Sequence, residues 1–180
     1  MRVRGKIVLL AASCLIGAAL TTLPAHAGPT PQPRAELVPA HDDPGPRGRA
    51  MYEGQNLSAG IERAAAPAWT CHLYVGDPEF VRHNGRWHIR GVGRQWCTGA
   101  GYIPQGPRLT LQRYLGVGIW RNVHRTSIAW SRGHFAEIQY MWACTGTGSE
   151  EYRWVVDGFA EGVPRSRRNA YSLHYLRVVC

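Results

Sequence analysis

Apolar and polar residues alternate with a period of two along much of the chain after Trp69. Between 135 and 144 the apolar side chains occupy every second position, and Glu137 and Gln139 lie between them. Tyr152 and Trp154 alternate with charged residues in the same way. This period is typical of β-strands with one buried face, and no stretch shows the period of an amphipathic helix. Strands are predicted over 71–75, 86–92, 108–115, 119–123, 126–130, 135–144, 152–157 and 171–180.

Glycine-rich breaks separate these stretches, and His83-Asn84-Gly85 is a hairpin turn signal. Roughly seven to nine short strands with frequent turns predict an all-β fold, either an immunoglobulin-like β-sandwich or a small barrel. Within it, Leu109, Leu111 and Leu115 are expected on one face of their strand, and Leu176, Val178 and Cys180 on one face of the last strand.

Residues 1–27 have the composition of a secretory signal peptide. Arg2, Arg4 and Lys6 form a charged start, an apolar run follows, and Ala25-His26-Ala27 is a small-x-small cleavage site. A lipoprotein acylated at Cys14 is the less favoured alternative. No later stretch reaches the roughly 18 apolar residues of a spanning helix. We therefore predict a secreted, extracellular protein.

Residues 28–68 differ from the rest of the chain in composition. They contain seven prolines and five glycines, and no phenylalanine or tryptophan. Such a segment buries too little apolar surface to offset its conformational entropy. We predict a flexible Pro/Gly-rich linker, with a short helix over 57–66 that Pro67 ends, and a β domain over 69–180. A propeptide and a partner-binding segment are the alternatives for this linker.

Four cysteines follow the signal segment, namely Cys71, Cys97, Cys144 and Cys180. An even number in an exported chain predicts two disulfides. The local pairs 71–97 and 144–180 are favoured. The main rival is 97–144, the cross-sheet bridge of an immunoglobulin-like sandwich, with Trp120 or Trp130 packed on it. The absence of a Cys-x-x-Cys pair argues against a metal site.

The order of these features resembles the small secreted, disulfide-stapled β proteins of actinobacteria, most of them uncharacterised. The residues that carry the resemblance are Cys97, Leu109, Leu111, Arg113, Trp120, Cys144, Gly146, Gly148, Tyr152, Arg153 and Cys180. The resemblance implies export and a β fold. It brings no active site and no cofactor with it.

Catalytic motifs are absent from the sequence. Glu150-Glu151 could supply one carboxylate of a glycosidase pair, with Asp157 or Glu137 as the second. The histidines are scattered, with no His-Glu-x-x-His and no Gly-x-Ser-x-Gly. We therefore predict a non-enzymatic protein that uses no cofactor and no metal.

Aromatic residues are more abundant than a core of this size requires. Seventeen lie within 69–180, so some are expected at the surface, where they can bind sugar rings or protein partners. The candidates on apparent outward faces or loops are Trp96, Tyr102, Tyr114 and Tyr175.

Arginine supplies the positive charge. Residues 28–180 hold 18 arginines against 12 acidic residues, a net charge of +6. Such a surface favours polyanions. The candidate basic residues are Arg82, Arg86, Arg90 and Arg94 in one hairpin, and Arg165, Arg167 and Arg168 in a later loop. Export argues against nucleic acid as a partner.

Together these observations predict a monomeric, secreted binding module for a polysaccharide or polyanion of the cell envelope or its surroundings. The alternative is a protein-interaction role, such as an inhibitor of an extracellular protease or a small antagonistic effector that uses the loop 158–169.

Overall fold

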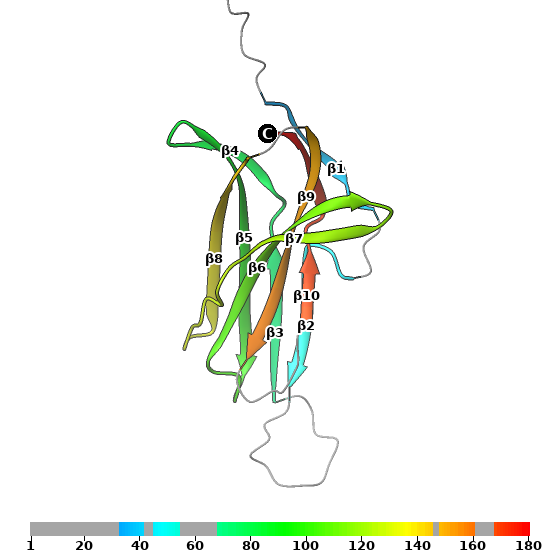
Figure 1. Ribbon diagram of the computed structural model, residues 1–180. Coiled ribbons are helices and arrows are strands. Elements are labelled where there is room, and N and C mark those ends of the chain that lie inside the picture. Colours follow the sequence, from blue (N-terminus) through cyan, green and yellow to red (C-terminus); the bar gives the residue numbers. More distant parts are fainter. Residues whose placement is uncertain (1–32, 42–44, 55–67, 146–147, 161–167) are drawn as a thin grey trace, which may run out of the picture. The chain divides into compact units, whose positions relative to one another are not determined.

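Strands account for all the regular structure in the part of the chain described by this computed structural model, which covers 33–41, 45–54, 68–145, 148–160 and 168–180 (Figure 1). The all-β prediction is confirmed. The expected signal peptide 1–27 and the expected helix 57–66 lie outside the described residues.

The first sheet, sheet A, is antiparallel in every pairing and follows the order β1-β11-β9-β6-β7. Because β9 is long, β11 pairs with its first half and β10 with its second. The strands are β1 (Ala35–Pro39), β6 (Gln105–Gly116), β7 (Ile119–Arg125), β9 (Ser149–Ala160), β10 (Arg168–Tyr171) and β11 (His174–Val179).

The second sheet, sheet B, is built around the 14-residue strand β5, which bonds β3 and β4 along its length and β8 on its other edge. The strand β2 adds to β3. The strands are β2 (Arg49–Gly54), β3 (Trp69–Val75), β4 (Glu79–His83), β5 (Arg86–Gly99) and β8 (Phe135–Ala143).

The two sheets pack face to face as a sandwich, and one apolar core lies between them (Figure 1). The predicted inward faces are confirmed for β8, β9 and β11, whose alternating apolar residues point into this core. The fully buried core side chains come from both sheets and include Trp69, Leu73, Ile89, Leu109, Leu111, Tyr152, Trp154 and Val156.

Two glycines on the inner face of β5 make room for the opposite sheet. A Cβ at Gly91 would lie 2.3 Å from Cε2 of Trp154, and one at Gly93 would lie 3.0 Å from Cδ2 of Leu109. The indole N–H of Trp154 donates a hydrogen bond to the carbonyl of Arg90 at 3.0 Å. These close approaches let a tryptophan fill the space between the sheets.

Both disulfides follow the local pairing. Cys71 and Cys97 lie directly opposite each other on β3 and β5, and their bridge is fully buried within sheet B. Cys144, just after β8, bonds to Cys180, just after β11, so this bridge joins the two sheets. The rival pair 97–144 does not form.

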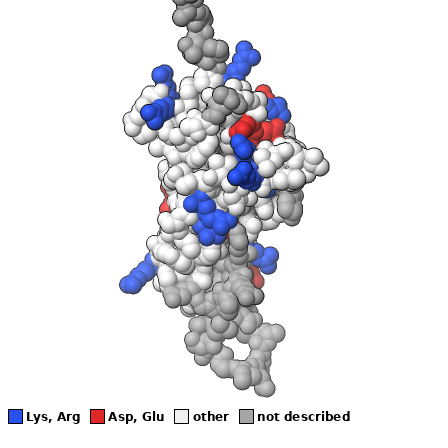
Figure 2. Space-filling model, viewed as in Figure 1, with Lys and Arg blue, Asp and Glu red and all other residues white. Residues whose placement is uncertain are grey.

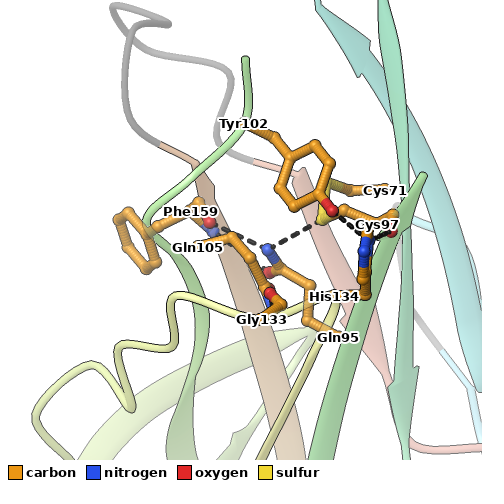
Figure 3. Close-up of a disulfide and its surroundings, with 8 residues drawn as sticks. All are labelled: Cys71, Gln95, Cys97, Tyr102, Gln105, Gly133, His134 and Phe159. Carbon is orange, nitrogen blue, oxygen red and sulfur yellow. Dashed lines mark hydrogen bonds between the residues drawn. A yellow bond between two sulfur atoms is a disulfide. The ribbon is translucent and has the colours of Figure 1, made fainter. Parts of the chain in front are cut away.

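The buried Gln95 links the sheets next to the first bridge (Figure 3). Its side-chain amide donates to the carbonyl of Phe159 at 2.8 Å, and its amide oxygen accepts from the backbone N–H of the same residue at 3.3 Å. A polar side chain in this position is stable because both ends of its amide are bonded.

The predicted linker is wrong in part. Within 28–68, β1 pairs with β11 and β2 pairs with β3, so the sandwich begins well before Trp69. The sequence gives little sign of this because β1 is mostly exposed and contains a proline. Such a strand is stabilised by backbone bonds to a neighbour that is distant in sequence.

Two smaller expectations also fail. Residues 126–130 form no strand, although the N–H groups of Thr126 and Ala129 bond to carbonyls of β6 at 2.9 Å each. Leu115 is exposed rather than on the buried face of Leu109 and Leu111. Leu115 is the extra, unpaired residue at the register shift between Tyr114 and Gly116, and it lies beyond Arg113, where the pairing of β6 with β9 ends.

Candidate functional site

The outer face of sheet B carries four apolar or aromatic side chains at directly opposed positions of four strands. Met51 of β2 lies opposite His72 of β3, His72 lies opposite Trp96 of β5, and Trp96 lies opposite Phe135 of β8. We call these four residues the aromatic row. Because opposed residues point to the same side of a sheet, the row crosses the whole face.

The row is open to solvent at both ends. Met51 is 55% exposed and Phe135 is 52% exposed, while His72 and Trp96 between them are half-buried. The His72 and Trp96 rings stack with centroids 5.1 Å apart and planes 12° apart. Stacking restrains both side chains, so a ligand would meet a preformed surface.

A second row of polar side chains runs beside the first. Arg49, Tyr74, Arg94 and Glu137 are the opposed residues of the same four strands. The Arg94 guanidinium lies 5.6 Å from the centre of the Tyr74 ring and donates to Glu137 at 2.6 Å. Hydrogen bonds from Gln139 and Arg94 lower the pKa of Glu137. We call these four residues the polar row.

One end of the aromatic row is held by the loops that precede β6 and β8 (Figure 3). The hydroxyl of buried Tyr102 bonds to the His134 ring, and the backbone N–H of Cys97 donates to the carbonyl of His134 at 2.8 Å. His134 directly precedes Phe135. These bonds therefore set the position at which β8 starts and at which Phe135 projects beside Trp96.

The other end of the row borders a groove between β2 and β10. It has a volume of about 500 Å³, and Arg49 and Met51 lie on one side of it and Arg168, Asn169 and Tyr171 on the other. Two guanidinium groups and a phenol at the end of an aromatic surface favour a ligand that carries anionic groups.

Of the four aromatic candidates, only Trp96 lies on this face. Tyr102 is 1% exposed and Tyr175 is fully buried, so the expectation that these two are exposed is wrong. Tyr102 is buried as part of the His134 anchor, and the hydroxyl of Tyr175 donates to the carbonyl of His41. A role of Trp96 or Tyr114 in binding stays a prediction.

Tyr114 and Tyr175 belong instead to an aromatic cluster around Arg153 on the outer face of sheet A. The Arg153 guanidinium lies 3.9 Å from the centre of the Trp120 ring and 4.6 Å from that of Tyr171. Its Nε donates to Gln112 at 2.7 Å. Burial lowers the pKa of Arg153 to about 10, so the group stays charged at neutral pH. The cluster is an internal stabilising feature of sheet A.

The predicted basic residues do not all lie on one face. Arg86, Arg90 and Arg94 share the outer face of sheet B, whereas Arg82, opposite Trp87, points to the other side of its hairpin. Arg90 is ion-paired with Glu79, which reduces its availability to a ligand.

The hairpin turn is confirmed, with Asn84 and Gly85 both at positive φ. Arg168 borders the groove, and Arg165 and Arg167 lie outside the described residues, as does most of the loop 158–169.

The carboxylates considered for catalysis are held apart. Glu150 points toward the core side of β9 and accepts from Arg113 at 2.8 Å, while Asp157 points outward and pairs with Arg108 at 3.0 Å. Glu137 lies on the other sheet. In the described part of the chain, no group of three or more His, Cys, Asp or Glu residues could hold a metal ion. The same residues contain no helix long and apolar enough to cross a membrane.

Comparison of the chain with protein-family models, with curated proteins and with solved structures gives no match. Met51, His72 and Phe135 were not found from the sequence, because no local pattern shows which residues of distant strands lie opposite each other.

Proposed function

We propose that the protein is a secreted, non-enzymatic binding module that holds an acidic polysaccharide of the cell envelope or its surroundings on the outer face of sheet B. The observation that carries the proposal is the aromatic row, in which Trp96 and Phe135 lie side by side on an open and rigid surface.

A sugar chain suits this surface because its rings present apolar C–H faces and a polar rim. Aromatic side chains on an open surface can contact such C–H faces, so a deep pocket is not required. His72 covers one face of the Trp96 indole. The sugar would therefore contact the part of the indole that is open to solvent together with the exposed ring of Phe135 beside it. A single indole and a phenyl ring support weak binding, and a polymer can compensate by offering many equivalent units.

The polar row and the groove favour acidic sugars over neutral ones. Arg49 lines both and forms no ion pair within the described residues, and Arg168 faces it across the groove. Guanidinium groups bind carboxylates and phosphates through paired hydrogen bonds. We assign secretion on the two disulfides, which persist in oxidising compartments, together with the signal-like start of the chain.

The test is retention of the oxidised full chain on insoluble neutral glycans and on acidic cell-wall polymers, at low and at high salt. We expect retention on the acidic polymers and a Trp96→Ala variant that loses at least tenfold in affinity. Arg49→Gln should weaken binding mainly at low salt, because salt screens exposed charges.

Trp130→Ala is the matched control, since Trp130 is 54% exposed but lies near β6 of sheet A. It should bind as the wild type does. Equal losses in Trp96→Ala and Trp130→Ala would mean that the face of sheet B is not the site. No retention on any polymer would refute the proposal and direct attention to the predicted alternative, an extracellular protein partner.

A further inference from the structure

The hairpin between β6 and β7 ends in an apolar tip. Its turn is Gly116-Val117-Gly118, and Leu115 and Ile119 flank it. Val117 is 96% exposed, Leu115 is 51% exposed and Ile119 is 59% exposed. Leu115, Val117 and Ile119 therefore expose three aliphatic side chains to solvent. This exposure is unfavourable because of the hydrophobic effect.

Val117 is also held in an unfavourable backbone conformation. Its φ is 51°, in the left-handed region, between two glycines that also have positive φ. A β-branched residue in this region is strained, and hairpin turns of this kind normally use Gly, Asn or Asp. A valine at this position costs folding free energy, and the cost points to a use outside the fold.

The base of the hairpin is firmly held, which keeps the tip projecting. The N–H of Gly118 donates to the hydroxyl of Tyr114 at 3.1 Å, and the Tyr114 and Trp120 rings lie 5.0 Å apart. Trp120 in turn packs edge-on against buried Tyr175 at 4.7 Å. The three aliphatic side chains are thus presented by a rigid arm.

Positive charge lies immediately behind the tip. Arg121 of β7 is exposed and lies directly opposite Arg113 of β6. Glu150, the nearby acidic partner of Arg113, is bound by it at 2.8 Å. Figure 2 shows the hairpin end as an uncharged projection on the right of the view, with basic and acidic side chains beside its base.

We propose that this tip inserts into the interface of an anionic lipid bilayer, with Arg121 contacting lipid phosphates. The tip is convex and has no hydrogen-bonding side chain, so it can enter an apolar layer without a complementary pocket. Protein-binding hot spots are instead rich in Trp, Tyr and Arg and poor in Leu and Val. Apolar insertion combined with basic residues is the usual arrangement for binding at a membrane surface.

The experiment is flotation of the oxidised full chain with large vesicles of phosphatidylcholine alone and of phosphatidylcholine mixed with phosphatidylglycerol. We expect the chain to float with the anionic vesicles. Val117→Asn should reduce the partition coefficient about tenfold or more, because burial of one valine side chain contributes on that scale. Arg121→Gln should reduce binding to the anionic vesicles and leave the weaker binding to neutral ones unchanged.

The Val117→Asn variant separates insertion from folding. Asn tolerates the left-handed conformation, so this variant should unfold at a higher denaturant concentration than the wild type while it binds vesicles less well. A lower stability would refute the argument from strain.

Leu37→Asn is the control for Leu115→Asn, because both leucines are 51% exposed and Leu37 lies on β1. Only Leu115→Asn should impair flotation. Trp96→Ala should float normally, which keeps this inference independent of the polysaccharide proposal. The lipid assignment would be overturned if the wild type did not float, or if Val117→Asn floated as well as the wild type. It would also be overturned if the tip were needed to bind a protein while the chain bound no vesicles.

Discussion

Replacement of Gly91 by alanine should destabilise the sandwich through one contact between the sheets. The added Cβ would lie 2.3 Å from Cε2, 2.4 Å from Nε1 and 2.5 Å from Cδ2 of Trp154. Carbon atoms in good contact are about 3.5 to 4.0 Å apart, so the indole or β5 must move by roughly 1 Å.

The size of the effect follows from two contributions. Overpacking of a filled core costs about 1 to 3 kcal/mol. A shift of the indole also weakens its hydrogen bond to the carbonyl of Arg90, worth about 1 kcal/mol. We expect a loss of about 2 to 4 kcal/mol in the free energy of unfolding, which lowers the Tm by on the order of 10 °C in a domain of this size.

The assay is urea denaturation with both disulfides intact, followed by tryptophan fluorescence. Gly76→Ala is the matched control, because a Cβ there would meet its nearest neighbours at 3.8 to 3.9 Å, an ordinary contact. A smaller ring in Trp154→Phe should recover part of the loss in the double variant. A Gly91→Ala protein within 0.5 kcal/mol of the wild type, or a double variant with no recovery, would refute this account of the interface.

Three further outcomes follow from the described contacts. Joint replacement of Cys71 and Cys97 by alanine should lower the free energy of unfolding by about 3 to 4 kcal/mol, because the bridge closes a 26-residue separation, and denaturation under non-reducing conditions measures it. Arg153→Met should lower it by about 1 to 3 kcal/mol through loss of the contact with Trp120, and a Tm equal to that of the wild type would contradict this. The pKa of Glu137 is lower in the folded state than in the unfolded state. The stability that its ionisation contributes is therefore present above the unfolded-state pKa and is lost as the pH falls through the folded-state pKa. Between pH 7 and pH 3, Glu137→Gln should lose less free energy of unfolding than the wild type, as denaturation at the two pH values measures.

The sequence predicts single residues of the candidate site but not the row that they form. Trp96 was selected because the domain holds more aromatic residues than its core requires and this one lies on an apparent outward face or loop. Its neighbours in the row were not found, because Met51 and Phe135 belong to strands that lie 45 and 39 residues away along the chain. The partner of a strand and its register depend on pairing that no local pattern encodes.

Burial of the aromatic candidates was equally beyond local patterns. Tyr102 and Tyr175 lie at positions that the sequence places in a loop or on an outward face, and both are buried. They are covered by segments that return from elsewhere in the chain, His134 in one case and His41 in the other. A tyrosine ring on the outer face of a sheet is exposed only when nothing packs over it.

The sequence by itself determined the all-β fold, the core faces of the long strands and the favoured disulfide pairing, because side-chain alternation and loop length are local properties. The tertiary structure decided the rest. It brought β1 and β2 into the two sheets, placed Gly91 under Trp154, and aligned four residues from four strands into the aromatic row. These features depend on which distant segments meet, and that is settled by the free energy of the whole sandwich rather than by any one strand.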